Sequence, residues 1–268
     1  MALKDDTCIF IQPDIPCLYS SGKHEFHPLP LPIGDEGLSF ERLPRNSLKF
    51  LKENEGAWKN SEKDFFVGPM NIRFNMFVYL RKKLFLISNS SPSAFRDKDG
   101  HYLPPYIMAY DFVAGGESMI VNLPEDTLED SLDWCCDLRI FEWGKEKSSD
   151  HSLCLVKYIR DSFTIWVFTE FKSSNKWRKI LEVGVKEMGV EEENPNVRGI
   201  NVINGNCLIF ATGRKVYGYY YFNDQSCWRL KEICEHNYWD YNSINLTPYS
   251  PTFRPCGTNE SSIVSTRP

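Results

Sequence analysis

The stretch Ile165–Trp177 reads IWVFTEFKSSNKW, and it decides the fold class. Apolar side chains occupy both parities of its first half, with Ile165 and Val167 on one face and Trp166 and Phe168 on the other. A strand that is buried on both faces has this pattern. The polar run that follows, Lys-Ser-Ser-Asn, predicts a turn, and the tryptophan after it predicts the start of a second strand.

The same order of strand, polar turn, large apolar residue and strand recurs along the chain. It is present in Leu18–Phe26, Leu48–Trp58, Ile107–Met119 and Tyr219–Trp228. The large apolar residues that anchor the five copies are Phe26, Trp58, Met119, Trp177 and Trp228, at steps of roughly 30 to 60 residues. Such a repeat predicts a mainly β fold. We expect a β-propeller-like (kelch-like) array of four-stranded antiparallel blades, which need not be complete.

The candidate strands group into units of four. Three units show all four strands, at about residues 74–123, 137–183 and 200–234. Two partial units precede residue 67. We therefore expect a single domain over residues 1–255, with its clear repeats over 47–234 and a disordered tail at 256–268.

Local signals support this division. Asn204-Gly205 is the strongest short hairpin signal, because both turn positions favour a left-handed backbone. Ile33–Pro44 contains two glycines and is expected to be a loop. Pro124–Trp134 carries the one helical pattern and is expected to be a short helix or an acidic loop. Long helices are missing, which argues against a parallel sheet with crossover helices.

Charge and cysteine usage exclude several classes of function. The net charge is −5 and the pI is about 5.6, which disfavours a general nucleic-acid binder and an electrostatic membrane binder. No apolar run approaches the length of a transmembrane helix, and the first residues do not resemble a signal peptide. Nine cysteines without a secretory signal predict free, mostly buried thiols in the cytoplasm, the nucleus or both.

The usual sequence signatures of chemistry are missing. Gly115-Gly116 fits a hairpin turn better than a phosphate loop. The spacing of Cys135, Cys136, Cys227 and Cys234 does not fit zinc, and His24 and His27 have no further ligand at a suitable spacing. We therefore predict no catalytic, cofactor-binding or metal-binding residues, no cofactor and no enzyme activity.

Two repeated residue types leave an alternative open. Asp111, Asp161 and Asp224 lie in or beside the turns of successive units, where aspartate commonly bonds its own backbone. The repeated tryptophans are expected to pack between blades, although they also fit a ligand cage. The alternative is a carbohydrate-binding or hydrolytic propeller. The basic run Arg81-Lys82-Lys83 is expected to be a solvated hairpin tip.

Several phrases, in order, resemble a known family. They are Leu48–Trp58, Phe77–Ile87 followed by Tyr106–Asp111, Asn122-Leu123-Pro124, Leu153–Trp177 and Thr247–Pro251. Over about residues 47–255 the chain is similar to plant F-box-associated domains. The resemblance implies the target-binding half of an SCF ubiquitin-ligase receptor, whose F-box binds a Skp1-type adaptor.

The chain departs from that family where the F-box is expected. Ile33–Gly37 carries two glycines and two acids, which cannot form the apolar stripe of an amphipathic helix. The resemblance therefore implies non-catalytic binding of an unidentified target protein, and it leaves adaptor binding in question. A decoy or scaffold without an F-box is a second alternative.

Loops on a rigid β-scaffold are the expected recognition elements. Three long polar segments qualify, namely Asn89–Pro105, Gly144–Asp150 and Val183–Pro195, the last of which contains Glu191-Glu192-Glu193. We expect these three loops to form one rim that binds the target.

Overall fold

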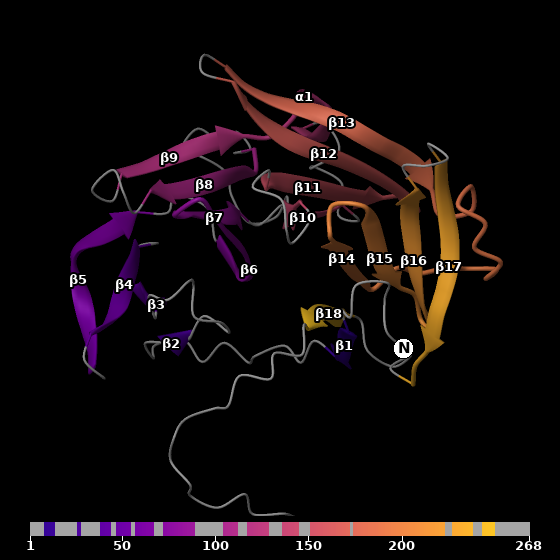
Figure 1. The fold of residues 1–268 in the computed structure, drawn as a ribbon, viewed down its shortest axis with the longest axis horizontal. Helices are drawn as coiled ribbons and strands as arrows, with labels where there is room; N and C mark the ends of the chain where they lie inside the picture. The colour runs from indigo at the N-terminus through magenta and orange to yellow at the C-terminus, as the bar shows by residue number, and fades with distance from the viewer. Residues whose placement is uncertain are drawn as a thin grey trace, which may run out of the picture.

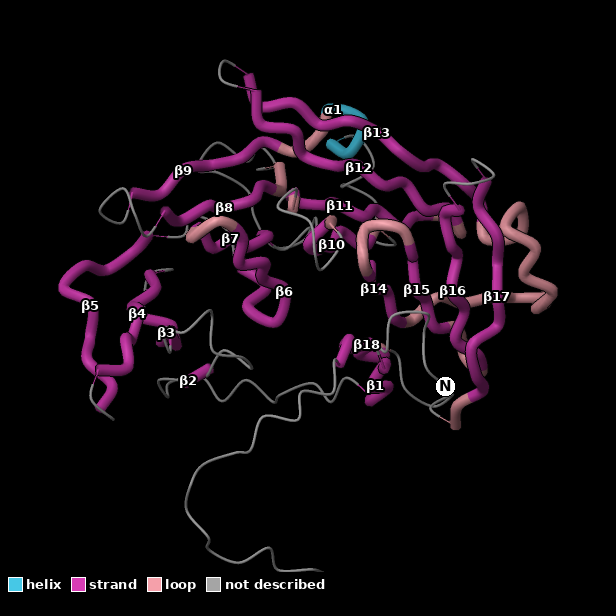
Figure 2. The backbone as a smooth tube through the Cα atoms, in the orientation of Figure 1, coloured by secondary structure: helices cyan, strands magenta, loops and turns pink. Residues whose placement is uncertain are grey.

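Strands make up nearly all of the secondary structure (Figure 2). The computed structural model describes residues 8–13, 26–27, 38–43, 47–54, 57–66, 72–88, 104–111, 117–128, 136–144, 151–171, 174–222, 227–237 and 243–249, with backbone alone up to residue 66. Within these ranges the one helix is α1 (Glu125–Leu128). This helix confirms the short helix expected after Pro124.

Sixteen of the strands form four antiparallel sheets of four consecutive strands each. The first comprises β2 (Phe26–His27), β3 (Leu38–Leu43), β4 (Ser47–Asn54) and β5 (Ala57–Phe66). The second comprises β6 (Ile72–Leu80), β7 (Lys83–Ser88), β8 (Tyr106–Asp111) and β9 (Glu117–Asn122). The third comprises β10 (Asp137–Trp143), β11 (Ser152–Ile159), β12 (Ser162–Phe171) and β13 (Ser174–Gly184). The fourth comprises β14 (Gly199–Ile203), β15 (Cys207–Ala211), β16 (Lys215–Phe222) and β17 (Cys227–Glu235).

The sheets follow one another around a common centre like the blades of a propeller (Figure 1). The first strand of each sheet lies towards the middle and the last lies outside. Accordingly β6, β10 and β14 are neighbours around the centre, and β14 is followed by β18 (Ile244–Tyr249). The predicted fold class, a propeller-like array of four-stranded antiparallel blades that is incomplete, is confirmed.

The predicted units agree closely with the second, third and fourth sheets. The hairpin at Asn204-Gly205 is present, with both residues at positive φ. One strand boundary differs, because β13 begins at Ser174, where a turn was expected. Ser174 pairs with Phe171, so the polar residues before Trp177 extend the hairpin instead of ending it.

Two predictions about the first 66 residues are wrong. Residues 38–43, expected in a loop, form β3, which pairs with β4. The first partial unit is not a blade of its own, because β1 (Cys8–Pro13) pairs antiparallel with β18 (Ile244–Tyr249). This two-stranded sheet joins the two ends of the chain beside the fourth blade. The expected tail at 256–268 lies outside the described residues.

The decisive stretch lies where two hydrophobic cores meet. Every side chain from Phe163 to Phe168 is buried. Trp166 and Phe168 pack in the core between the second and third blades, while Phe163 and Ile165 pack in the core between the third and fourth. Phe163 crosses the latter boundary, with its ring centroid 5.3 Å from that of Phe210. The prediction of a strand buried on both faces is therefore confirmed.

The repeated anchors do not behave alike. Trp177 packs against the core between the second and third blades, and its Nε1 donates to the backbone oxygen of Asn122 at 2.8 Å. This bond joins the outer strands of two blades, as expected for an inter-blade anchor. Trp228 instead stacks on Tyr219 of its own sheet, with ring centroids 5.2 Å apart.

Met119 contradicts the core prediction, because it is 43% exposed. It lies on β9, the outermost strand of its blade, where a side chain has no further strand to pack against. The side chains of Phe26 and Trp58 lie outside the described residues.

Candidate binding surface

The blades present two ends to a partner, and strand order decides which loops share an end. In a four-stranded meander the loops alternate between the two ends. The hairpin end carries the first-to-second strand turns, described at residues 81–82, 144, 151 and 204–206. The connector end carries the second-to-third strand turns and the segments between blades, described at residues 123–128, 160–161, 185–198, 212–214 and 236–237.

Contacts at each end agree with this division. The backbone N–H of Val185, between blades, donates to the oxygen of Asp161, in a second-to-third turn, at 2.8 Å. In the same way, the backbone N–H of His236 donates to the backbone oxygen of Arg214 at 2.8 Å. At the hairpin end, a Cβ on Gly205 would come within 2.8 Å of the nitrogen of Gly144.

The expectation that three loops form one rim is therefore wrong. Gly144–Asp150 joins β10 to β11 and leaves from the hairpin end, whereas Val183–Pro195 runs from the end of β13 towards β14 and belongs to the connector end. Asn89–Pro105 lies almost wholly outside the described residues, but it joins β7 to β8 and so departs from the connector end. Sequence gives the length and polarity of a loop, whereas the end it occupies depends on strand count.

The connector of residues 185–198 is fixed although it has no regular secondary structure. Val185, Met188 and Val190 are buried in the core between the third and fourth blades. The Nζ of Lys186 donates to the backbone oxygens of Glu192 and Glu193. The apolar side chains hold the segment to the scaffold, and the lysine closes it on itself.

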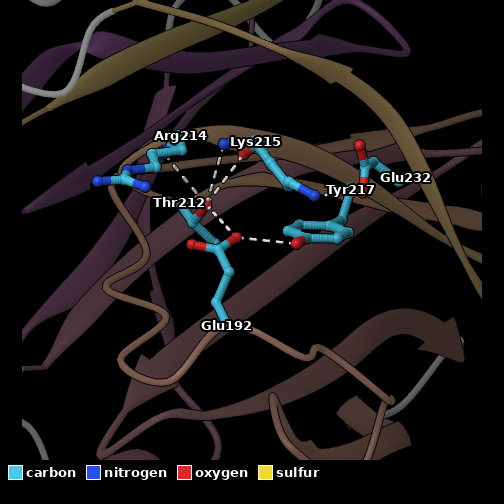
Figure 3. A network of polar contacts seen from close by, with 6 residues as sticks. All are labelled: Glu192, Thr212, Arg214, Lys215, Tyr217 and Glu232. Carbon is cyan, nitrogen blue, oxygen red and sulfur yellow. Dashed lines mark hydrogen bonds and ion pairs between the residues drawn. The ribbon is translucent and has the colours of Figure 1, made fainter.

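A polar network attaches the same connector to the fourth blade (Figure 3). Oε1 of Glu192 accepts the hydroxyl of Thr212 at 2.7 Å and that of Tyr217 at 2.8 Å. Thr212 is buried, and its Oγ1 also lies within hydrogen-bond distance of the backbone of Arg214 and Lys215. A carboxylate that accepts two hydroxyl donors is a strong anchor, since charged acceptors make the stronger hydrogen bonds.

Electrostatics around the network follow from burial. Burial, followed by the hydrogen bond and charge of Glu192, raises the pKa of Tyr217. Burial lowers the pKa of His236, whose Nε2 lies 3.2 Å from the oxygen of Thr212. Both shifts favour the neutral form of the group, as suits a structural attachment.

The outward side of the connector is polar. Glu191, Glu193, Asn194 and Asn196 are exposed, on either side of the anchored Glu192. The backbone that carries these carboxylates and amides is already fixed, so a partner has to order only their side chains. This surface can therefore recognise a partner with basic or hydrogen-bonding side chains.

A second attachment holds α1 to the third blade. Lys157 is only 6% exposed, and its Nζ donates to the backbone oxygen of Asp126 at 3.2 Å. Lys179 pairs with the Asp126 carboxylate at 2.8 Å. Both ammonium groups also lie over the ring of Trp166, at 5.5 and 5.8 Å from its centroid. The connector end thus has two fixed segments, one at each boundary of the third blade.

The aspartates considered for acid/base chemistry do not converge. Asp111 ends β8 at the hairpin end, 3.6 Å from Lys83. Asp161 lies in a turn at the connector end, at φ 58°, and accepts the hydroxyl of Tyr158 at 2.8 Å. Asp224 lies outside the described residues. Asp161 lies in a turn, as expected, but its carboxylate accepts a tyrosine hydroxyl where a bond to its own backbone was expected. The two carboxylates lie at opposite ends of their blades and cannot share a substrate.

The described part of the chain contains no group of three or more His, Cys, Asp or Glu residues that could hold a metal ion. The five cysteines whose side chains are described are free, and two of them, Cys154 and Cys207, are buried. Burial raises the pKa of Cys207 to about 12. The side chains of His24, His27 and Cys135 lie outside the described residues. No described helix is long and apolar enough to span a membrane.

No protein-family model and no curated protein matches this chain.

Sequence reasoning missed the residues that fix the connector. Glu192 stands in the middle of a run of three glutamates, and only the structure distinguishes it from its exposed neighbours. Its partners Thr212 and Tyr217 lie 20 and 25 residues further along the chain. The sequence signal that could have shown the segment to be anchored is its three apolar residues, Val185, Met188 and Val190, within a charged run. All three are buried.

Proposed function

We propose that this chain is a non-catalytic recognition module that binds a target protein through the connector end of its blade array. The observation that supports it best is the fixed connector of residues 185–198, anchored through Glu192 while Glu191 and Glu193 stay exposed. Because the backbone of this connector is already held in place, complex formation has to order only its exposed side chains, which lowers the entropic cost of binding. Loops on a rigid scaffold are also the common position of binding residues.

The similarity to plant F-box-associated domains supports the same proposal in a more specific form. The module would then act as the substrate-recognition part of a ubiquitin-ligase receptor, or as a decoy if no adaptor binds. The residues that follow Ile33–Gly37, where an F-box was expected, form strands β3 and β4 and not helices. A cytoplasmic or nuclear setting fits the five free cysteines of the described residues.

The carbohydrate alternative finds less support. Trp177 is engaged with Phe168, at 5.0 Å between ring centroids, and with the backbone of Asn122. Trp228 is covered on one face by Tyr219. These rings do not surround a common space, so the recognition proposal is preferred. A glycan array with no specific hits would agree with that preference.

The test begins with target identification. The purified 268-residue chain is used to capture partners, each candidate is produced in pure form, and its dissociation constant is measured by calorimetry. The double variant Glu191→Ala/Glu193→Ala is then compared with Lys176→Ala/Arg178→Ala, which changes two exposed side chains on β13. We expect the first variant to weaken binding at least tenfold and the second to leave it unchanged. Equal affinities for both variants would refute the connector end as the binding surface.

A parallel measurement separates the receptor from the decoy. A Skp1-type adaptor and a cullin are mixed with the chain, and complex formation is followed by size-exclusion chromatography. Adaptor binding would assign the chain to a ligase. Target binding without the adaptor would assign it to a free module.

A further inference from the structure

A small cavity opens at the hairpin end, between the second and third blades. Its volume is about 50 Å³, and its walls include two leucines together with Arg81, Lys83, Phe85, His151, Ser152 and Phe168. Apolar rings thus meet several hydrogen-bond donors around a space for a few water molecules or one small oxyanion.

The turn beside the cavity uses unfavourable residues. Arg81 and Lys82 occupy both central positions of the β6–β7 turn at φ 51° and 61°. The corresponding turn of the fourth blade places Asn204 and Gly205 there, at 53° and 61°. A left-handed backbone costs an ordinary residue roughly 1–2 kcal/mol, and Asn-Gly is the favoured pair. The β6–β7 turn therefore carries two cations in place of a better turn sequence.

The charges at the turn are available to a ligand. Arg81 and Lys82 are exposed and make no ion pair with any residue that the structure describes. Two carboxylates lie close by, since Lys83 is 3.6 Å from Asp111 and His151 Nδ1 is 2.6 Å from Glu142. Arg81 therefore supplies the uncompensated charge of the cavity, with Lys82 beside it.

We propose that this cavity binds the phosphate group of a phosphate monoester. Such a group carries close to two negative charges at neutral pH and three acceptor oxygens. Arg81, Ser152 and His151 line the cavity, and their guanidinium, hydroxyl and imidazole groups can donate hydrogen bonds to phosphate oxygens. The volume admits the phosphate but not an attached sugar or ring, so the organic part of the ester lies outside. The site is at the opposite end from the proposed target surface and does not depend on it.

The experiment titrates the full chain with three probes, followed by the chemical-shift changes of its amide groups in NMR spectra. O-phosphoserine, O-phosphotyrosine and inorganic phosphate are compared at constant ionic strength, with sulfate as the reference anion. We expect saturable shifts for residues around 81–83 and 151–153, with tighter binding than for sulfate. A preference for a phosphoamino acid would support the assignment and indicate a modified side chain as the natural ligand, whereas a preference for inorganic phosphate would contradict the monoester assignment.

Two variants decide the assignment. Arg81→Asn/Lys82→Gly introduces the turn pair of the fourth blade, so it should fold at least as well as the natural chain. We expect it to lose at least tenfold in phosphate affinity. Arg214→Ala/Lys231→Ala removes two exposed cations elsewhere and should bind normally. The proposal is refuted if both variants bind alike, or if the natural chain shows no saturable shifts.

Discussion

At the residue scale, Glu192 differs from the two glutamates beside it in exposure and hydrogen bonding. Glu192 accepts two hydroxyl groups, while Glu193 is exposed and its side chain has no hydrogen bond with the described residues. The same residue type therefore has different roles at two adjacent positions. Only the first role fixes the connector to the fourth blade.

Replacing Glu192 by alanine should therefore destabilise the protein. Tyr217 would lose the acceptor of its hydroxyl group, whereas Thr212 keeps the backbone oxygen of Lys215, and a stranded buried polar group costs about 1–3 kcal/mol. Urea unfolding followed by tryptophan fluorescence measures the change. The matched control, Glu193→Ala, should stay within about 0.5 kcal/mol of the natural chain. Equal losses for both variants would contradict the network in Figure 3.

Tyr217 predicts how stability changes in alkali. Because its pKa is raised in the folded protein, the folded state keeps the phenol proton after the unfolded chain begins to release it near pH 10.0. Its contribution is complete below pH 10.0 and is lost as the pH rises towards the folded value. The urea midpoint of the natural chain should therefore fall above pH 10, and that of Tyr217→Phe should fall less steeply. Parallel pH profiles would contradict this.

At the element scale, β12 and the turns show what local sequence can determine. The alternating pattern of Ile165–Phe168 identified a doubly buried strand, because both parities were apolar. Asn204-Gly205 identified a turn from its backbone preference alone. The same reasoning failed for Leu38–Leu43, where two nearby glycines suggested a loop but pairing with β4 makes a strand. Cross-strand hydrogen bonds outweighed local preference there.

Gly205 carries an element-scale prediction. It lies at φ 61°, and an added Cβ would meet the nitrogen of Gly144 at 2.8 Å. Gly205→Ala should therefore destabilise the protein by about 2 kcal/mol, measured by urea unfolding. Gly213→Ala is the control, because its Cβ would meet nothing closer than 3.8 Å. That variant should be neutral or stabilised by up to about 1 kcal/mol. Equal effects would show that the β14–β15 turn can relax.

At the scale of the whole molecule, the sequence identified the blades but not the pairing of β1 with β18. Each blade is a meander of neighbouring strands, so its pattern is local. The pairing of Cys8 with Tyr249 joins segments at opposite ends of the chain, and no local pattern predicts such a partner. The prediction of which end each loop occupies failed for a related reason. Assigning Gly144–Asp150 to an end of its blade requires the correct number of strands before it. The candidate binding surface was therefore only partly predictable.

The sheet of β1 and β18 predicts how the chain ends stabilise the array. Ile244 and Leu246 are buried against the fourth blade, and the N–H of Ile244 donates to the oxygen of Arg198 at 2.9 Å. Deleting residues 1–13 would leave β18 without its paired strand, and a lone strand on a sheet margin is weakly held.

Hydrogen exchange followed by mass spectrometry measures the consequence of that deletion. Amides of residues 244–249 should exchange at least tenfold faster in the shortened chain, because backbone groups that bonded β1 become exposed to water. Amides of β12 should keep their protection, since two cores cover that strand. Deleting residues 256–268, a segment of equal length, is the control and should change neither region. Unchanged exchange in β18 after loss of residues 1–13 would show that the fourth blade holds this strand without its partner.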